Sequence, residues 1–333
     1  MNRLLSPTFL VSAALLIVGL CLPLFIQSSF QLRIVMLIWV YTILGLGFNL
    51  LFGLAGQLSL GQQGFFAIGG YAMALMQTKL GTPLYLAIPA ALVLCAILAA
   101  AVGMPLLRLR SHYLAMATLM FGLIIEGLAL RWFELTGGSA GVRVPPIAFG
   151  DWSLTRYQIY YFVFGLAVLA FLFHAFILST AGGRALQAIR GDETAARSLG
   201  VNVTTYKLRV FVLAAVFAGL AGVTFAIVAR QVDPSYSALT ININLLTIAV
   251  VGGLRSRIGP VLGAAFVVLT PQFLTQFHEY ESLLYGIGLL AFLIFIPRGL
   301  AGLIERKGRV VSTAAAGNEV KPEPLRPANG EAR

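Results

Sequence analysis

Polar side chains gather in one short segment of this otherwise apolar chain. The segment GLAGQLSLGQQG (53–64) holds Gln57, Gln62 and Gln63 together with four glycines. Between two apolar segments such groups are costly unless the backbone turns and its polar atoms find partners. A kinked, non-helical segment could line a path for a polar molecule, with weak contacts that lower the desolvation barrier without trapping it. Alternatively, the segment forms a tight turn at the cytoplasmic surface.

Three further polar residues lie inside apolar stretches. Asn242 and Asn244 are two positions apart, so on a helix they face different sides, and only one of them is expected to face a path. Glu126 lies in the apolar segment 112–131, where a carboxylate is a functional candidate. It could instead sit near the outer end of its helix, paired with Arg131 or another polar neighbour, as a structural anchor. The anchor is the role we expect.

The sequence contains no recognisable catalytic motif. There is no Gly-x-x-x-x-Gly-Lys-[Ser/Thr] phosphate loop, and His112, His174 and His278 are too far apart for a metal-binding pattern. The two cysteines, Cys21 and Cys95, lie in apolar segments and predict neither a disulfide nor a metal site. We therefore expect a chain without enzyme activity, cofactor or metal.

A polar, arginine-rich stretch, GRALQAIRGDETAARSLG (183–200), separates two long apolar segments. Asp192 is a good N-cap and Gly200 a good residue to follow a helix, so the sequence predicts a short helix over Glu193–Leu199. A short, well-capped helix in such a loop is either a plain connector or a handle for a soluble partner.

The composition shows what kind of fold must position these residues. Hydrophobic residues make up 59% of the 333 residues and charged residues only 11%. A water-soluble fold of this length could not hide so much apolar surface behind so few charges. We therefore predict an all-α, polytopic transmembrane helical bundle. The net charge of +11 is spread in short clusters between apolar segments, which is typical of topology signals and not of a nucleic-acid surface.

About ten apolar segments, within a range of about eight to ten, are long enough to span a membrane. They run roughly over 8–26, 33–52, 61–78, 84–107, 112–131, 158–178, 209–229, 238–254, 259–277 and 282–297. The stretches 239–251 and 260–277 could be re-entrant or broken.

Basic residues indicate the orientation of these spans. We place the N-terminus and the C-terminus in the cytoplasm, because the arginines around 108–110 and 184–209 then fall inside. Of the 23 basic residues, those left outside are Arg33, Lys79, Arg131, Arg143, Arg156 and Arg230.

The same topology divides the chain into a membrane domain and a tail. The membrane domain covers 1–309, with a cytoplasmic loop at about 180–208 and an ordered external loop at about 132–157. We expect 310–333 to be a disordered cytoplasmic tail, since nothing in it can form a core. Small residues at helical spacing predict close helix packing; they are Ala214, Ala215, Ala218, Gly219, Gly222, Gly259 and Gly263.

Five blocks, in this order, resemble the LivM-type permease of branched-chain amino acid ABC importers. They are GLAGQLSLGQQGFFAIGGY (53–71), LRLRSHYLAMATLMFG (107–122), LTGGSAGV (135–142), GRALQAIRGDETAARSLGVNVTTYKLRVFVLAAVFAGLAG (183–222) and VVGGLRSRIGPVLGAA (250–265). Within the fourth block, TAARSLG (194–200) resembles the EAA-x-x-x-G loop of ABC importer permeases, which sits in a cleft of the ATPase.

The sequence departs from the family pattern at three places. Thr194 replaces the acidic first residue of the loop motif, although Glu193 is adjacent. Leu123 stands where the family carries a carboxylate, and Glu126 follows one turn later. The stretch RSR (255–257) replaces a less charged turn. The second and third departures are compatible with an altered substrate or merely with a different interface.

The resemblance implies the permease subunit of an ATP-driven importer in the bacterial inner membrane, which moves branched-chain or related amino acids into the cytoplasm. The implied partners are a second, LivH-type permease, two cytoplasmic ATPases that use ATP and Mg, and a periplasmic solute-binding protein. The residues expected to contact the ATPase are Arg190, Asp192, Glu193, Thr194, Ala195, Ala196 and Gly200. Those expected along the path are Gln57, Gln62, Gln63, Asn242, Asn244 and Glu126.

External arginines are the candidates for docking the binding protein, because such docking is electrostatic. They are Arg143, Arg156 and Arg230, which could instead anchor helices at the headgroup layer. An importer of urea or short amides is an alternative within the same class. A secondary transporter or a membrane-embedded enzyme would need intramembrane ionisable pairs or clustered catalytic residues, which are scarce here.

Overall fold

The computed structural model describes residues 7–109, 111–146, 148–149, 152–254 and 256–274, and a few positions beyond them, namely 283, 286–287, 290 and 299–302. Side chains are described from Leu16 on, except at 111, 148–149 and 152–153. The expected tail 310–333 and most of the expected last span, 282–297, lie outside the described residues.

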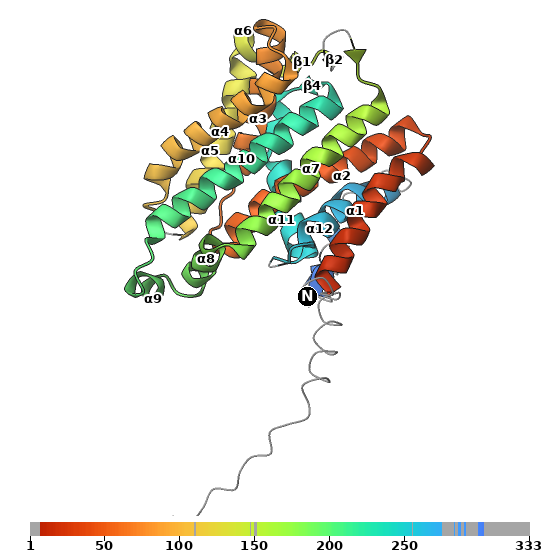
Figure 1. Ribbon diagram of the computed structural model, residues 1–333. Coiled ribbons are helices and arrows are strands. Elements are labelled where there is room, and N and C mark those ends of the chain that lie inside the picture. Colours follow the sequence, from red (N-terminus) through yellow and green to blue (C-terminus); the bar gives the residue numbers. More distant parts are fainter. Residues whose placement is uncertain are drawn as a thin grey trace, which may run out of the picture.

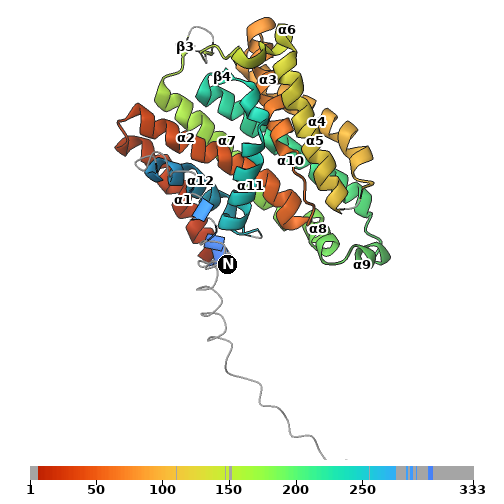
Figure 2. The ribbon, with the colours of Figure 1, turned by 180° about the vertical axis from the view of Figure 1, so that it is seen from behind.

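Helices pack side by side into one bundle, seen from two opposite sides in Figure 1 and Figure 2. In chain order they are α1 (Pro7–Phe25), α2 (Ser29–Phe48), the π-helix η1 (Asn49–Leu54), α3 (Gln62–Lys79), α4 (Leu84–Leu106), α5 (Ser111–Arg131), α6 (Phe133–Thr136), the 3-10 helix η2 (Gly138–Ala140), α7 (Arg156–Ser179), α8 (Ala181–Gly191), α9 (Glu193–Ser198), α10 (Val203–Ala229), the 3-10 helix η3 (Pro234–Ser237), α11 (Leu239–Gly252) and α12 (Gly259–Leu274).

Among the described residues, five helical stretches are long and apolar enough to cross a membrane. They are Ser29–Leu54, Leu84–Leu106, His112–Arg131, Arg156–Ser179 and Val203–Ala229. The fold class, an all-helical membrane protein, is therefore confirmed. Helix α11, with 14 residues, is shorter than the roughly 20 residues that a span needs, and α12 is described over 16 residues, up to Leu274. The number of spans and the side on which the termini lie stay predictions.

Two helices form the centre of the bundle. In the apolar windows of α2 and α10, 78% and 72% of the residues are buried, against 28% in each of α4, α5 and α7. Small residues allow the central contacts, as the sequence predicted. A Cβ atom added at Gly222 would overlap the carbonyl oxygen of Phe66 in α3, and one added at Gly263 would overlap that of Ile248.

Helix α10 is longer than the apolar segment suggested at roughly 209–229. It begins at Val203, because the side-chain oxygen of Asn202 accepts a hydrogen bond from the N–H of Thr205 and caps the helix there. The polar first turn of α10 extends the expected span toward α9.

The two ends of the bundle differ in structure. At one end (top of Figure 1) lie α6, η2 and four two-residue strands: β1 (Val142–Arg143), β2 (Ala148–Phe149), β3 (Trp152–Ser153) and β4 (Gln231–Val232). Strand β1 pairs antiparallel with β4, and β2 with β3. The turns around β1 use Gly137, Gly138 and Gly141 with positive φ. The opposite end carries α8 and α9.

Candidate functional site

The helical path is interrupted between η1 and α3. Residues 55–61 form no regular helix, and they connect η1 to α3. The N–H of Leu60 donates to Oγ1 of Thr118 in α5 at 3.0 Å, and Nδ2 of Asn242 in α11 donates to the carbonyl of Leu60 at 2.6 Å. We call residues 55–61 the first break.

The first break ends at mid-depth in the bundle. Phe65, in the first turn of α3, has its carbonyl oxygen 3.8 Å from Sγ of Cys95. Cys95 is the central residue of α4, which runs from Leu84 to Leu106. Helix α3 therefore starts level with the middle of a neighbouring span, so the depth favours the interpretation as part of a path over a turn at the cytoplasmic surface.

The three predicted glutamines are buried at this break. Gln57, Gln62 and Gln63 are 5%, 1% and 0% exposed, and Ser59 is 1% exposed. None of their side-chain nitrogen or oxygen atoms has a hydrogen-bond partner among the described residues. The amide of Gln63 packs directly on Gly122 of α5, where any larger residue would displace it. Buried polar groups without partners are rare in proteins, so this cluster is the strongest candidate for a functional site.

A second interruption lies between α11 and α12, with residues 253–254 and 256–258 described, and it touches η1, the helix that leads into the first break. Nδ2 of Asn49 in η1 donates to the carbonyl of Leu254 at 3.1 Å, and Oδ1 of Asn49 lies 3.3 Å from Nε2 of His174 in α7. The guanidinium of Arg190 in α8 donates to the carbonyl of Gly53. The sequence analysis missed Asn49, whose signal was a lone amide at the end of an apolar run.

The predicted loop helix is present with the predicted caps. Oδ1 of Asp192 accepts hydrogen bonds from the N–H groups of Thr194 and Ala195 at 2.7 and 3.0 Å, and Gly200 has φ +83°. The helix ends one residue earlier than predicted, at Ser198.

One predicted contact residue of this helix faces inward. Ala196 is only 2% exposed, so it packs α9 on the bundle and does not belong to the helix surface that a partner could reach. Leu199, which the sequence analysis did not single out, is 81% exposed. Glu193 forms an ion pair with Lys207 in the first turns of α10, so α9 is joined to a central helix.

A hollow connects this helix with the first break. On one side it is lined by Gln57, and on the other by Glu193 and Arg197 of α9. Arg108 and Lys207 complete its basic rim. The loop helix and the polar break thus border the same space.

The other expected path residues are more dispersed. Asn242 is 3% exposed and holds the first break, while Nδ2 of Asn244 lies 3.5 Å from the hydroxyl of Tyr41, so the two amides do face different sides. Glu126 is half-buried on α5. The side chains of Glu126 and Arg131 are both described and form no ion pair with each other, so the suggested pairing of these two residues is wrong.

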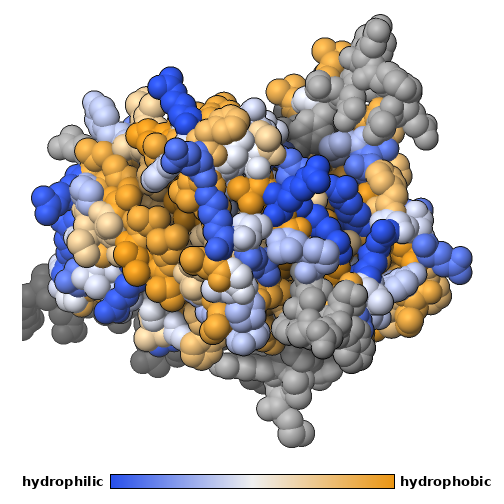
Figure 3. Space-filling view, turned by 90° about the horizontal axis from the view of Figure 1, so that it is seen from above, coloured by the Kyte–Doolittle hydropathy of each residue, from blue (hydrophilic) through white to orange (hydrophobic). Residues whose placement is uncertain are grey.

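Arginines gather at the opposite end of the bundle. Arg156 and Arg230, two of the three candidates for docking, line one hollow together with Arg33, at the ends of α7, α10 and α2. Arg143 lies apart on β1, paired in register with Gln231. Figure 3 looks onto this end and shows hydrophilic side chains among apolar patches. All four arginines belong to the set that the charge pattern places outside.

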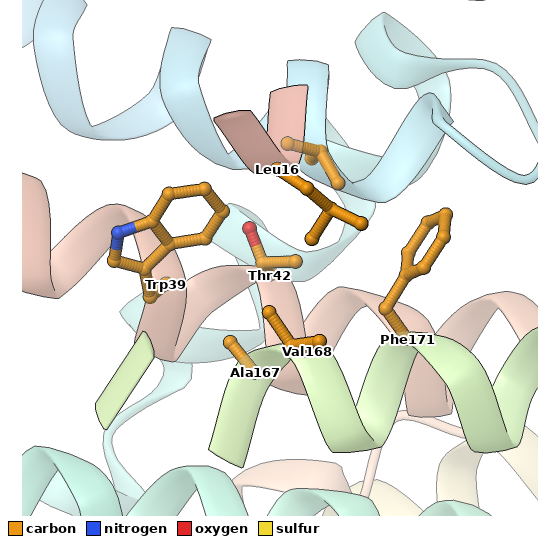
Figure 4. Close-up of a pocket in the computed structure, with 7 residues that line it drawn as sticks. Leu16, Trp39, Thr42, Ala167, Val168 and Phe171 are labelled. Atoms are coloured by element: carbon orange, nitrogen blue, oxygen red, sulfur yellow. The ribbon is translucent and has the colours of Figure 1, made fainter. Parts of the chain in front are cut away.

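Another pocket is apolar. Leu16 of α1, Trp39 and Thr42 of α2, and Ala167, Val168 and Phe171 of α7 surround it, with Val261 of α12 (Figure 4). Its single hydroxyl, that of Thr42, makes it unsuited to a charged or zwitterionic ligand. We interpret it as a packing defect between helices.

Long apolar helices around a buried, polar helix break define a multi-pass membrane protein of the permease class. Within the described residues no group of three His, Cys, Asp or Glu side chains could hold a metal ion. The chain belongs to the family of branched-chain amino acid transport system permease components, whose model matches residues 30–293.

Individual relatives agree with this family. The chain is 34% identical to the high-affinity branched-chain amino acid transport system permease protein LivM of Escherichia coli and to that of Salmonella typhimurium, over 92% of the chain and 78% of each relative. It is 28% identical to the probable permease protein LivH of Methanocaldococcus jannaschii, over 76% of the chain and 86% of that protein. No solved structure matches the fold.

Proposed function

We propose that this chain is the permease subunit of an ATP-driven importer that carries branched-chain amino acids across the bacterial inner membrane into the cytoplasm. The names of the LivM relatives support the substrate class. In this proposal, ATP and Mg are used by two partner ATPases, a periplasmic binding protein delivers the amino acid, and a second, LivH-type permease completes the membrane part.

The observation that carries the proposal is the position of α9. It is capped by Asp192, exposes Leu199 at the end of the bundle, and contacts α10 through the pair Glu193–Lys207. Arg190, in the adjoining helix α8, reaches the carbonyl of Gly53 just before the first break. A push on α8 and α9 from an ATPase would therefore reach the polar break through direct contacts.

The substitution Leu199→Asp tests this role. A charge on the exposed apolar contact should prevent ATPase binding without disturbing the bundle, because Leu199 is 81% exposed. We expect loss of ATPase co-purification and of uptake by the reconstituted importer. The matched control is Leu80→Asp. Leu80 follows the C-terminus of α3 and is 71% exposed. Wild-type co-purification and uptake in the Leu199→Asp variant would contradict the proposal.

The arginine hollow is the proposed docking site of the binding protein. Its arginines, Arg33, Arg156 and Arg230, have no acidic partner within 4 Å among the described residues, so they are available to carboxylates of a docked protein. Reversing all three charges to Glu should raise the binding-protein concentration needed for half-maximal uptake and weaken its salt dependence. Arg131→Glu, at the exposed end of α5, is the single-site control. An unchanged concentration and salt dependence would argue against docking here.

A further inference from the structure

We propose that the N-terminal end of α3 binds the carboxylate of the transported amino acid. This inference rests on the proposed function and deepens it, because it names the part of the substrate that the buried break would recognise. Its residues are Ser59, Gln62 and Gln63.

The start of α3 offers backbone donors. Gly61 precedes the helix and provides no side-chain cap, so the N–H groups of Gln62 and Gln63 have no acceptor in a preceding helical turn. The 18 residues of α3 give this end the positive pole of a helix dipole, which favours an anion. In membrane transporters, half-helices that start at mid-depth present such an end to anionic groups of the substrate.

Side chains add a second, independent set of donors. The amides of Gln62 and Gln63 and the hydroxyl of Ser59 are at least 99% buried, and their polar atoms have no partner among the described residues. Because the Cα–Cβ bonds of a helix tilt toward its N-terminus, Gln62 and Gln63 project toward the same end as the free N–H groups. The N-terminal end of α3 therefore offers both backbone and side-chain donors to a bound anion.

The cluster contains no charged residue. The segment 53–64 has only apolar, glycine, serine and glutamine residues. Neutral donors hold a carboxylate less tightly than an arginine would, so they stabilise it during passage and still release it. A lysine or arginine at the same place would form a deep energy well that stops transport.

The position of the site agrees with a step just before release. Gln57, at the cytoplasmic side of the first break, lines the hollow under α9. The carboxylate would leave the end of α3 past Gln57 into this hollow, beside the helix that we expect the ATPase to move.

Thiol protection tests the site directly. In the complete importer, with Cys21→Ser and Cys95→Ala removing the native thiols, Ser59→Cys places a thiol at the site, and its reaction with methyl methanethiosulfonate is followed in each nucleotide state. The probes are leucine, isocaproate, which has the carboxylate alone, and isoamylamine, which has the amine alone. We expect leucine and isocaproate to slow the reaction about tenfold at about ten times the dissociation constant, and isoamylamine to have no effect. Ser256→Cys, in the second interruption, is the matched control and should show no protection.

Three results would overturn the proposal: protection by isoamylamine equal to that by isocaproate, no protection by any probe, or a thiol that reacts in no nucleotide state. Gln62→Glu, made in the same background, should abolish protection by isocaproate, because a carboxylate of similar length then occupies the end of α3. Gln77→Glu, at the far end of the same helix, should leave it intact. Equal protection in both glutamate variants would contradict our assignment. These readouts do not require ATP-coupled uptake, so a failed coupling experiment and a failed carboxylate site are distinguishable.

Discussion

The two interruptions of the helical bundle both border η1 and are built in opposite ways. In the second one, the backbones of Gly252 and Gly259 touch, and Oγ of Ser256 accepts a hydrogen bond from the N–H of Ile258 at 3.3 Å. In and beside the first one, the amides of Gln57, Gln62 and Gln63 have no partner among the described residues. The second is closed by packing and an internal hydrogen bond, whereas the first has buried polar groups without partners among the described residues.

This difference separates stability from function. A buried polar atom without a partner costs about 1–3 kcal/mol, so apolar residues of similar size at the first break would give a more stable bundle. Residues that lower stability and are packed as carefully as Gln63 on Gly122 are expected at functional sites. Asn49 joins the second interruption to η1, which leads directly into the first break, so a movement of one interruption can be transmitted to the other through η1.

The largest effect is expected where the second interruption is tightest. A Cβ atom at Gly252 would overlap the carbonyl oxygen of Gly259, so Gly252→Leu should destabilise the bundle by at least about 3 kcal/mol and abolish monodisperse protein in size-exclusion chromatography. Gly127→Leu is the control, because nothing lies within 4 Å of the position of its Cβ. Normal yield of the Gly252→Leu variant would show that the second interruption is not closed by packing.

At the first break, stability and transport should move in opposite directions. Replacing Gln62 and Gln63 together by Met keeps their volume and removes buried amides, so thermal stability should stay equal or rise, by about 1–3 kcal/mol per orphaned group at most. Uptake by the assembled importer should fall about tenfold or more, since polar contacts to the substrate are lost. Ser256→Ala provides the comparison: it should lower stability by about 1 kcal/mol and leave uptake per assembled complex unchanged. Loss of stability with full uptake in the double variant would make the first break structural.

The hydrogen bond between η1 and the second interruption should have an intermediate effect when it is removed. Asn49→Leu leaves the carbonyl of Leu254 and Nε2 of His174 without their partner, so we expect a loss of about 1–3 kcal/mol in the free energy of unfolding. If the link also transmits movement, ATP hydrolysis should continue while uptake per ATP falls. Hydrolysis and uptake that decline in parallel would limit Asn49 to a structural role.

Several helix positions and helix ends that depend only on residues close together in the sequence were predicted correctly. Hydropathy located the long helices, and the capping residues Asp192 and Gly200 located α9 within one residue of its end. The polar first turn of α10 was missed, because average hydropathy detects the apolar residues of the helix but not the cap formed by Asn202.

Long-range arrangements were beyond the same reasoning. The depth at which α3 begins depends on its contact with Cys95, and the meeting of Asn49 with Leu254 joins residues far apart in the chain. The inward face of Ala196 was likewise invisible, since a short helix of small residues shows no apolar periodicity.

The smallest effect on uptake is expected from substituting Glu126, and this substitution also tests whether α5 contacts the substrate. Glu126 is one helical turn from Gly122, on which Gln63 packs, so its carboxylate could in principle meet an ammonium group while the end of α3 holds the carboxylate. Yet Glu126 is half-exposed and has no ion pair among the described residues, and ion contacts of exposed carboxylates contribute about 1 kcal/mol or less. Glu126→Gln should therefore change uptake less than about fivefold and leave the preference among amino acids unaltered, as measured by competition in the reconstituted importer. If the variant assembles but loses transport or changes its preference, Glu126 is the contact for the ammonium group, and the first break shares recognition with α5.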